Sequence, residues 1–570
     1  MSEPTNEIST AAESHSGNTS NLTAMPAGRM KLVGAISLMV CLMIYVLRLD
    51  KVVGLVVDDA WYVLLAKSLA NGQGYSLINS PSPNILPLYP PGFPFLLSLF
   101  FRIHPDFPGN VWLLKSVTIG AMMIVGILCY CYFRNMRHLP PFLAWGIGFM
   151  TVTCPPLVFL ATSSVMSDGV FTLWFLLTIV TTEACKRAGD NWKGRGFAVL
   201  AAAFSSGAFL TRSIGVSLIV AAFLYLLKER LVRSALIYTA LITLFCSPWM
   251  IYSRLHAPTL NHQLEQGGNM VLPYTDQFWQ KIAGDSSSGT DTVANLPNRV
   301  WKNSIEFLGQ DVCHILTAVF FEALKSPFEE AQKVLKKRES RREIIPLSMF
   351  LSIFVIFGYF AVAREKVTFA EIAVPLSLAV IILWPFETFR YVLPLAPFVT
   401  FYFLRGALEI QRLIRRKHND SQVQWGIMHL ALVLLIAINL FGNIRYIANL
   451  HFGSFLDKPI WISKFEEAEK VFEKIRQQVP KTDVIASLNP AMVTLYTGHK
   501  TVSWDDPSKR WETWKTLSVR YMVWISVYPQ QIDDFESNYR QVYLSREGSG
   551  FRILDLGPPE TRVPWGTRPK

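Results

Sequence analysis

Two adjacent carboxylates, Asp58 and Asp59, follow the first long apolar segment of the chain, which runs from Leu32 to Leu49. A charged side chain at the edge of a hydrocarbon layer is costly unless it is paired or used in function. A carboxylate at such a position can also accept the proton of a reacting hydroxyl group. The pair therefore indicates an active site at a membrane boundary.

The residues behind the acid pair predict how it is positioned. Apolar residues recur at helical spacing from Ala60 to Ala70, which predicts an amphipathic helix lying on the membrane surface. Pro90-Pro91-Gly92-Phe93-Pro94 then blocks helix continuation and redirects the chain before Phe95 to Phe101.

Composition places the chain among membrane proteins. Of its 570 residues 51% are hydrophobic and only 17% are charged, which is too apolar for an ordinary soluble enzyme. The net charge of +12 lies largely beside apolar runs, so we interpret it as a topology signal and expect no nucleic-acid binding. The seven cysteines show neither disulfide nor metal-ligand spacing.

Apolar runs long enough to cross a layer of roughly 30 Å predict eleven transmembrane helices. They lie at about 32–49, 112–133, 141–162, 167–184, 197–211, 213–228, 234–252, 345–363, 369–386, 391–409 and 424–444. Lysines and arginines concentrate in alternate short loops, such as the loop with Arg134 and Arg137, which makes those loops cytoplasmic. Asp58 and the tail after residue 445 are then external.

The chain divides into three parts. Residues 1–28 predict a disordered cytoplasmic tail, and residues 29–452 predict a mainly α transmembrane domain with external loops at 50–111 and 253–344. Within the second loop, residues 311–325 predict an interfacial helix and residues 284–292 a mobile lid.

Residues 453–570 predict a small external α/β domain. Its expected helices are 460–479, 490–496, 507–517 and 530–539, and its expected strands are 484–488, 501–504, 521–526, 541–544 and 551–556.

Three motifs carry a family resemblance. The runs Asp58-Asp59-Ala60-Trp61-Tyr62, Gly72-Gln73-Gly74-Tyr75 and Tyr89-Pro90-Pro91-Gly92 together resemble the first external loop of integral-membrane GT-C glycosyltransferases. The nearest branch is the bacterial relatives of dolichyl-phosphate-mannose protein mannosyltransferase and of lipid A aminoarabinose transferase. The chain departs from that branch at Tyr89, where aminoarabinose transferases have lysine, and at Asp59, where many relatives have glutamate.

The resemblance implies site residues along the membrane domain. Asp58 would be the general base, and Asp59 or Asp168 would orient the acceptor or hold the base. Asp168 stands in Ser163-Ser164-Val165-Met166-Ser167-Asp168-Gly169, where a helix N-terminal cap is an equally good interpretation. Tyr62 and Tyr89 would lie in the acceptor loop.

Two cationic motifs complete the expected site. Arg390 and Tyr391 begin Arg390-Tyr391-Val392-Leu393-Pro394, a motif similar to one that recurs in these transferases, and a guanidinium offers paired donors to phosphate oxygens. Arg212, in Leu210-Thr211-Arg212-Ser213, would be a second phosphate contact. The alternatives are an aromatic belt around Arg390 and a headgroup contact for Arg212.

The expected function is transfer of a monosaccharide from a polyprenyl-phosphate donor to an acceptor hydroxyl on a glycan, lipid or protein, outside the bacterial inner membrane. No cofactor is expected; a divalent metal is left open, but no residue spacing indicates one. The alternatives are a transporter or flippase of lipid-linked sugar and a membrane scaffold. Within the transferases the runner-up is an oligosaccharyltransferase-like enzyme or a sugar-polymer ligase. Such enzymes usually have a Trp-Trp-Asp motif in the outer domain, and Val502-Ser503-Trp504-Asp505-Asp506 does not match it.

Overall fold

A computed structural model gives the fold of the chain. It describes residues 27–284, 288–317, 345–414, 421–453, 458–504, 507–525, 540–544 and 551–557. The expected tail up to residue 26, the middle of the expected lid (285–287), residues 318–325, Asp505–Asp506 and the expected helix 530–539 lie outside the described residues.

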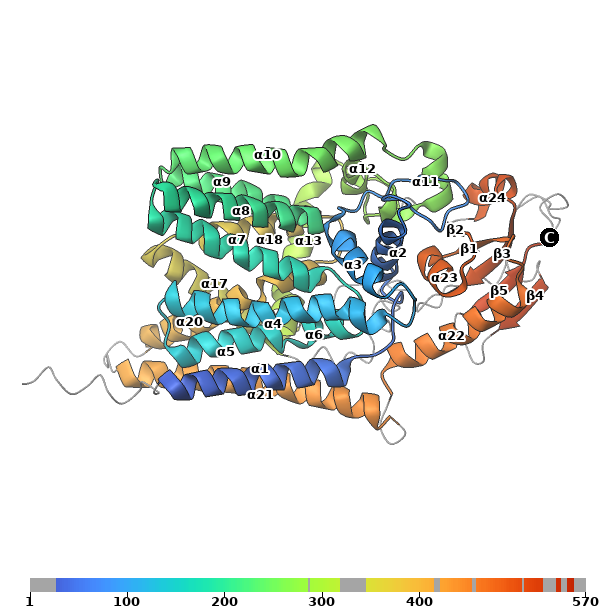
Figure 1. Cartoon of the computed structure of the whole chain (residues 1–570). Helices are drawn as coiled ribbons and strands as arrows, with labels where there is room; N and C mark the ends of the chain where they lie inside the picture. Colours follow the sequence, from blue (N-terminus) through green and yellow to red (C-terminus); the bar gives the residue numbers. More distant parts are fainter. Residues whose placement is uncertain are drawn as a thin grey trace, which may run out of the picture.

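Most described residues form a bundle of long helices, with a small α/β domain attached at one end (Figure 1). The bundle helices are α1 (Ala27–Arg48), α4 (Val111–Asn135), α5 (Pro141–Val152), α6 (Pro155–Thr162), α7 (Asp168–Ala188), α8 (Trp192–Thr211), α9 (Val216–Lys228), α10 (Val232–Leu255), α17 (Pro346–Glu365), α18 (Ala370–Leu383), α19 (Phe389–Val392), α20 (Ala396–Ile414) and α21 (Ser421–His451). Shorter helices connect them: α2 (Asp58–Ala70), α3 (Gly92–Ile103), α11 (Leu260–Gln266), α12 (Tyr274–Trp279), α13 (Leu296–Glu306) and α14 (Val312–Leu316).

The chain is a polytopic membrane protein. Among the described residues, six helices are long and apolar enough to cross a membrane, or seven if the bent pair α5–α6 counts as one span. The six are α4, α7, α10, α17, α19–α20 and α21. Each of the other expected spans coincides with a helix that is shorter or less apolar, namely α1, α8, α9 and α18. The number eleven therefore stays a prediction.

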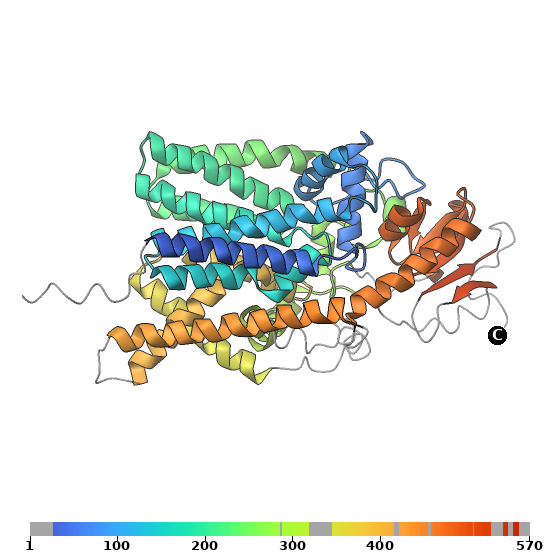
Figure 2. The same cartoon turned by 60° about the horizontal axis from the view of Figure 1, so that its bottom comes forward.

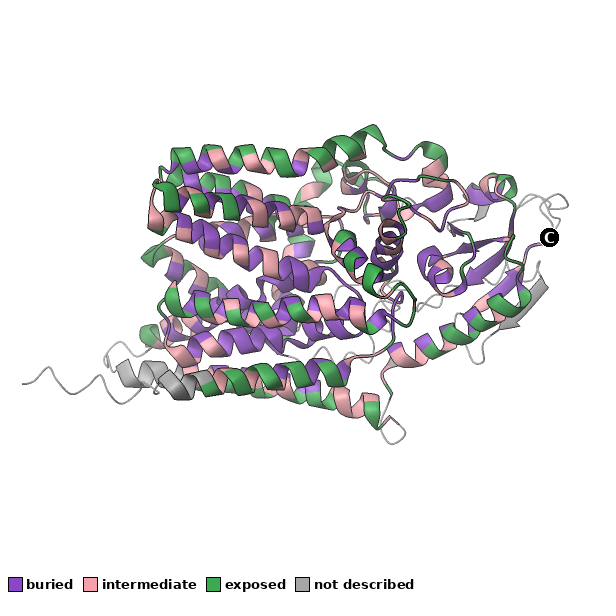
Figure 3. Ribbon diagram, in the orientation of Figure 1, coloured by how far each residue is buried: buried purple, intermediate pink, exposed green. Residues whose placement is uncertain are grey.

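Peripheral helices expose apolar side chains, as expected for surfaces that face lipid. Helix α10 lies at the edge of the bundle and is exposed along most of its length (Figure 3). Helices α17 and α20, in contrast, touch backbone to backbone. A Cβ atom at Gly358 would lie 1.8 Å from the Tyr402 carbonyl oxygen, and one at Gly406 would lie 1.8 Å from that of Phe354. Small residues allow this close approach between membrane helices.

Helix α2 corrects the prediction of an amphipathic surface helix. Its buried residues include every position from Asp59 to Ala66. The helix contacts α3 and also α23 (Pro490–Thr497) of the C-terminal domain. Because these two partners cover it, α2 does not lie on a membrane surface with one polar side exposed.

The prediction of an interfacial helix at 311–325 was also wrong in its described part. Residues 312–316 form α14, which is buried and contacts α17 and α20. At its C-terminal end, the Leu316 carbonyl oxygen accepts a hydrogen bond of 3.0 Å from Asn439 Nδ2 of α21. The segment is apolar because it enters the protein core.

The C-terminal domain is a mixed five-stranded sheet in the order β2-β1-β3-β5-β4. Its strands are β1 (Val484–Ser487), β2 (Thr501–Ser503), β3 (Val519–Trp524), β4 (Arg540–Leu544) and β5 (Arg552–Asp555). Strand β1 pairs in parallel with β2 and β3, whereas β5 pairs antiparallel with β3 and β4. The five predicted strands occur, and so do the three predicted helices that fall on described residues. Their ends lie within about two residues of the expected ones.

Alternate residues of these strands face two different cores. Ile485 and Val523 join the main core with α22 (Ile460–Gln478) and α23, while Ala486 and Met522 pack with the tryptophans of α24 (Pro507–Thr516). Helix α22 follows α21 and leads away from the bundle to the sheet, at an angle to α21 (Figure 2). Helix α23 packs against α2, and Asn489 and Met492 at its N-terminal end contact Gly54 in the loop that precedes Asp58.

Candidate active site

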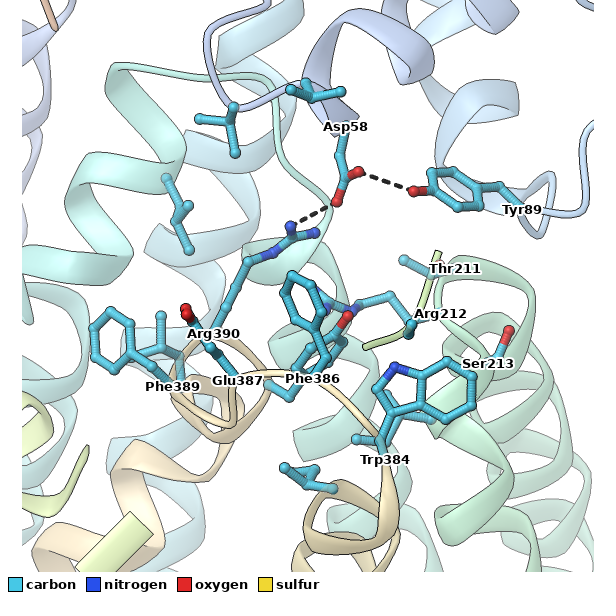
Figure 4. Close-up of a pocket in the computed structure, with 18 of the residues that line it drawn as sticks. Asp58, Tyr89, Thr211, Arg212, Ser213, Trp384, Phe386, Glu387, Phe389 and Arg390 are labelled. Carbon is cyan, nitrogen blue, oxygen red and sulfur yellow. Dashed lines mark hydrogen bonds and ion pairs between the residues drawn. The ribbon is translucent and has the colours of Figure 1, made fainter. Parts of the chain in front are cut away.

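A cavity of about 810 Å³ lies where the first loop, the ends of several bundle helices and the C-terminal domain meet. Its wall is mostly aromatic and aliphatic, with Asp58, Arg212, Glu387 and Arg390 as the charged residues (Figure 4). The side chains that give the wall its aromatic character are Tyr62, Tyr89, Phe159, Phe209, Tyr274, Trp384, Phe386, Phe389, Tyr391 and Trp461. A largely apolar ligand with one charged or polar group matches such a wall.

Asp58 begins α2 and reaches the cavity. Its Oδ2 accepts a hydrogen bond from Arg390 Nη1 at 2.6 Å, and its Oδ1 accepts one from the Tyr89 hydroxyl at 2.9 Å (Figure 4). The Asp58 side chain is 24% exposed and that of Arg390 is 23% exposed. The carboxylate is thus oriented by two donors while remaining open to a molecule in the cavity.

Asp168 lies behind this pair, is fully buried and does not line the cavity. It begins α7, but neither its side chain nor that of Ser167 caps the helix. Instead, its carboxylate forms ion pairs with Arg390, at 3.3 Å from Nε, and with Arg212. The structure therefore favours the role of a support for the two arginines over the N-cap interpretation.

Arg212 and Tyr391 are adjacent in the same wall. The Arg212 guanidinium lies 5.0 Å from the centre of the Tyr391 ring, a cation–π contact that helps to hold it. Two arginines and two acids that are far apart in the sequence thus meet in one charged cluster, formed by Asp58, Asp168, Arg212 and Arg390. Its formal charge is zero, because two cations balance two anions.

Asp59 points away from the cavity and is fully buried. Its Oδ2 accepts a hydrogen bond from the Gly54 N–H at 2.8 Å, and its Oδ1 accepts one from the Ala60 N–H at 3.0 Å. Burial raises the pKa of Asp59 to about 6, partly offset by these hydrogen bonds. Asp59 is therefore placed to hold the loop that carries Asp58.

Tyr62 and Tyr89 form an aromatic pair beside Asp58, with ring centres 5.6 Å apart. Burial and the nearby Asp58 charge raise the pKa of Tyr89 well above its usual value. The same two causes raise the pKa of Tyr62. Both phenols therefore stay neutral, and Tyr89 acts as a hydrogen-bond donor to Asp58.

Several cavity residues were missed by the sequence analysis. Tyr274, Gln277 and Ala283 come from the long loop after α10, and their positions depend on contacts that no local pattern reveals. Phe159 comes from α6, which bends away from α5 by 46°. The Pro155-Pro156 pair was a readable signal of that break, since a proline pair disrupts a helix and broken spans often line ligand sites.

Across the described ranges, no group of three or more His, Cys, Asp or Glu side chains is arranged to hold a metal ion.

The described ends of the expected lid are held by an isolated bridge between Gln280 and Thr290 and by an ion pair of 2.6 Å between Arg299 and Asp291. Ala283, at the start of this turn, contributes to the cavity wall.

No protein-family model and no curated protein matches the sequence. Solved structures do resemble the fold. The oligosaccharyltransferase AglB of Archaeoglobus fulgidus, in complex with an inhibitory peptide and a dolichol-phosphate, superposes with a TM-score of 0.51 at 12% identity, over 87% of this chain and 69% of that one.

ArnT of Cupriavidus metallidurans covers more of both chains. Its complex with undecaprenyl phosphate gives a TM-score of 0.54 at 10% identity, over 93% of this chain and 98% of that one. Its apo form gives 0.55 at the same identity and coverage. AglB and ArnT are membrane glycosyltransferases of the GT-C fold, and the fold of this chain is of that class.

Proposed function

We propose that this protein is a membrane glycosyltransferase that moves a monosaccharide from a polyprenyl-phosphate donor to an acceptor hydroxyl, with Asp58 as the general base. The observation that carries the proposal is the placement of an oriented, partly exposed carboxylate beside two arginines at the wall of a mostly apolar cavity. The GT-C fold supports it, because both fold relatives were solved with a polyprenyl or dolichol phosphate.

The reaction needs a base beside the acceptor hydroxyl and a cation beside the donor phosphate. The acceptor oxygen forms a bond to the anomeric carbon while the bond from that carbon to the phosphate oxygen breaks. Asp58 takes the acceptor proton, and the polyprenyl phosphate leaves as an anion. Tyr89 and Arg390 orient the carboxylate through their hydrogen bonds. A general base is most effective when it is held in the orientation that the reaction requires.

Arg390 and Arg212 would bind the donor phosphate. A guanidinium matches phosphate oxygens with paired donors, and an apolar surrounding strengthens the attraction. Arg390 contacts both Asp58 and Asp168, so it can pass from the carboxylate to the phosphate without losing all its partners. The aromatic wall formed by Trp384, Phe386 and Phe389 suits the lipid chain.

The direct test is transfer from radiolabelled polyprenyl-phosphate monosaccharides by the purified protein, with wild type beside Asp58→Asn. We expect the variant to lose about 100-fold or more in kcat, the usual contribution of a general base. Its folded amount should be unchanged, because the side chain is partly exposed, the amide oxygen can still accept from Tyr89, and Arg390 keeps its ion pair with Asp168. Full turnover in Asp58→Asn would remove Asp58 from the mechanism.

The same assay separates the proposal from its alternative. A wild-type protein that binds the lipid-linked sugar but neither transfers nor hydrolyses it, and that moves it across a proteoliposome membrane, would be a transporter or flippase. The donor should be varied between hexose and pentose carriers, because the cavity wall alone does not select one sugar.

A further inference from the structure

The loop before Asp58 adopts an unfavourable backbone conformation. Val57 has φ of 70° and ψ of −59°, a region that β-branched residues rarely occupy. Backbone strain of this kind persists only when surrounding contacts impose it. Val57 immediately precedes the proposed base, so the contacts that impose this conformation also set the position of Asp58.

Those contacts converge on Gly54. Its N–H donates to Asp59 Oδ2 at 2.8 Å, and its carbonyl oxygen accepts from the Val57 N–H at 3.0 Å. The same carbonyl accepts a hydrogen bond of 2.5 Å from Asn489 Nδ2, which belongs to the C-terminal domain. Gly54 has φ of 105°, and a Cβ atom there would lie 2.5 Å from Met492 Cγ.

Asn489 is itself fixed. It is 3% exposed, and its Oδ1 accepts from the Met492 N–H at 3.3 Å as the N-terminal cap of α23. Its own N–H donates to Ser487 Oγ at 3.1 Å, at the end of β1. The strand and helix of the outer domain thus aim one amide group at the loop of the membrane domain.

We propose that Asn489 is a positioning residue for the base, so that docking of the C-terminal domain sets the place of Asp58 through Gly54. The inference rests on the proposed function for the role of Asp58, but the coupling of Asn489 to the loop stands on contacts alone. Asn489 touches neither the cavity nor the reacting atoms.

The test uses Asn489→Asp in the full-length protein. Aspartate keeps the shape and the cap acceptor for Met492 but has no N–H to donate to Gly54. We expect faster amide hydrogen exchange in peptides covering residues 53–60, and a fall in kcat of about tenfold or more, since small misplacements of a catalytic group are costly. The KM for the donor should change little.

Gly498→Ala is the matched control. Gly498 ends α23 with φ of 74°, so alanine strains the same helix without reaching Gly54. The control should leave the exchange of residues 53–60 and kcat near the wild-type values. An equal effect of both variants would show that general weakening of the domain suffices, and would overturn the inference.

Unchanged exchange in Asn489→Asp, or faster exchange with wild-type kcat, would also overturn it. A wild type with no transferase activity would instead count against the proposed function alone. In that case the exchange experiment still decides whether Asn489 holds the loop.

Discussion

Asp168 joins two cations that would otherwise face each other across the cavity wall. Its carboxylate is fully buried, and the side chains of Arg212 and Arg390 are 7% and 23% exposed. Asp168→Asn should lower the free energy of unfolding by about 3–5 kcal/mol, because removing one member of a buried ion pair leaves charges uncompensated. Thermal unfolding of the purified protein in detergent measures the effect.

The control for Asp168→Asn is Glu365→Gln. Glu365 pairs with Arg405, and its side chain is 58% exposed. A surface ion pair contributes about 0–1 kcal/mol, so this variant should melt close to the wild type. Similar losses in both variants would contradict a special role for the buried pair.

Asp59 makes stability depend on pH. Its pKa is raised by burial from 3.8 to about 6 in the folded state, so the folded protein binds a proton more tightly than the unfolded one. Stability from this group therefore increases as the pH falls from about 6 towards 4 and is lost as the pH rises again. Subtracting the melting temperature of Asp59→Asn from that of the wild type cancels the other carboxylates.

That difference should shift in favour of the wild type on acidification between these limits. A pH-independent difference would mean that Asp59 is ionised throughout. At neutral pH the variant should lose less activity than Asp58→Asn, since Asp59 holds the loop and does not reach the cavity.

Among the elements, α17 packs against α20, and Arg390 lies in α19, the short helix that precedes α20. We therefore expect this packing to influence the position of Arg390. Gly358→Ala would place a methyl group against the Tyr402 carbonyl and should cost about 1–3 kcal/mol. Helix separation should also raise the KM for the donor. The paired measurement is melting temperature and steady-state kinetics on one preparation.

Gly120→Ala in α4 is the control for this helix contact. No atom lies within 4 Å of a Cβ atom built there, so alanine should be neutral or stabilise by up to about 1 kcal/mol through helix propensity. If both glycine variants behave alike, close packing of α17 on α20 is not what the site depends on.

For the whole molecule, cysteine labelling can test the orientation of the protein in the membrane. The sequence predicts that the basic helix ends are cytoplasmic and that the C-terminal domain is external. In a Cys131→Ser background, a cysteine replacing the exposed Glu473 should react with a membrane-impermeant maleimide in intact cells, and one replacing the exposed Lys193 should react only after permeabilisation. The reverse pattern would invert the topology.

The sequence was informative wherever one local rule decides the structure. Apolar runs located the helices because a membrane span must be long and must satisfy its own backbone, and short apolar runs located the strands of the outer domain. Asp58, Arg212 and Arg390 were all candidates, and the structure brings them together.

The sequence failed where burial depends on partners far along the chain. Helix α2 is covered by α23, more than 400 residues later, and α14 is inserted into the bundle. The strain at Val57 and its link to Asn489 leave no local pattern either. Such features arise from tertiary contacts, which periodicity and composition do not encode.

The pairing of α1 with α21 has a consequence for biogenesis. These helices lie side by side in both views, and Arg48 Nη1 donates to Asn443 Oδ1 at 2.6 Å (Figures 1 and 2). The ribosome makes the proposed base early, but its loop receives the Asn489 contact only after α21 has been inserted and the outer domain has emerged. A chain that ends between Arg390 and Asn489 therefore carries Asp58, Asp168, Arg212 and Arg390 but lacks the contact that completes the loop before Asp58.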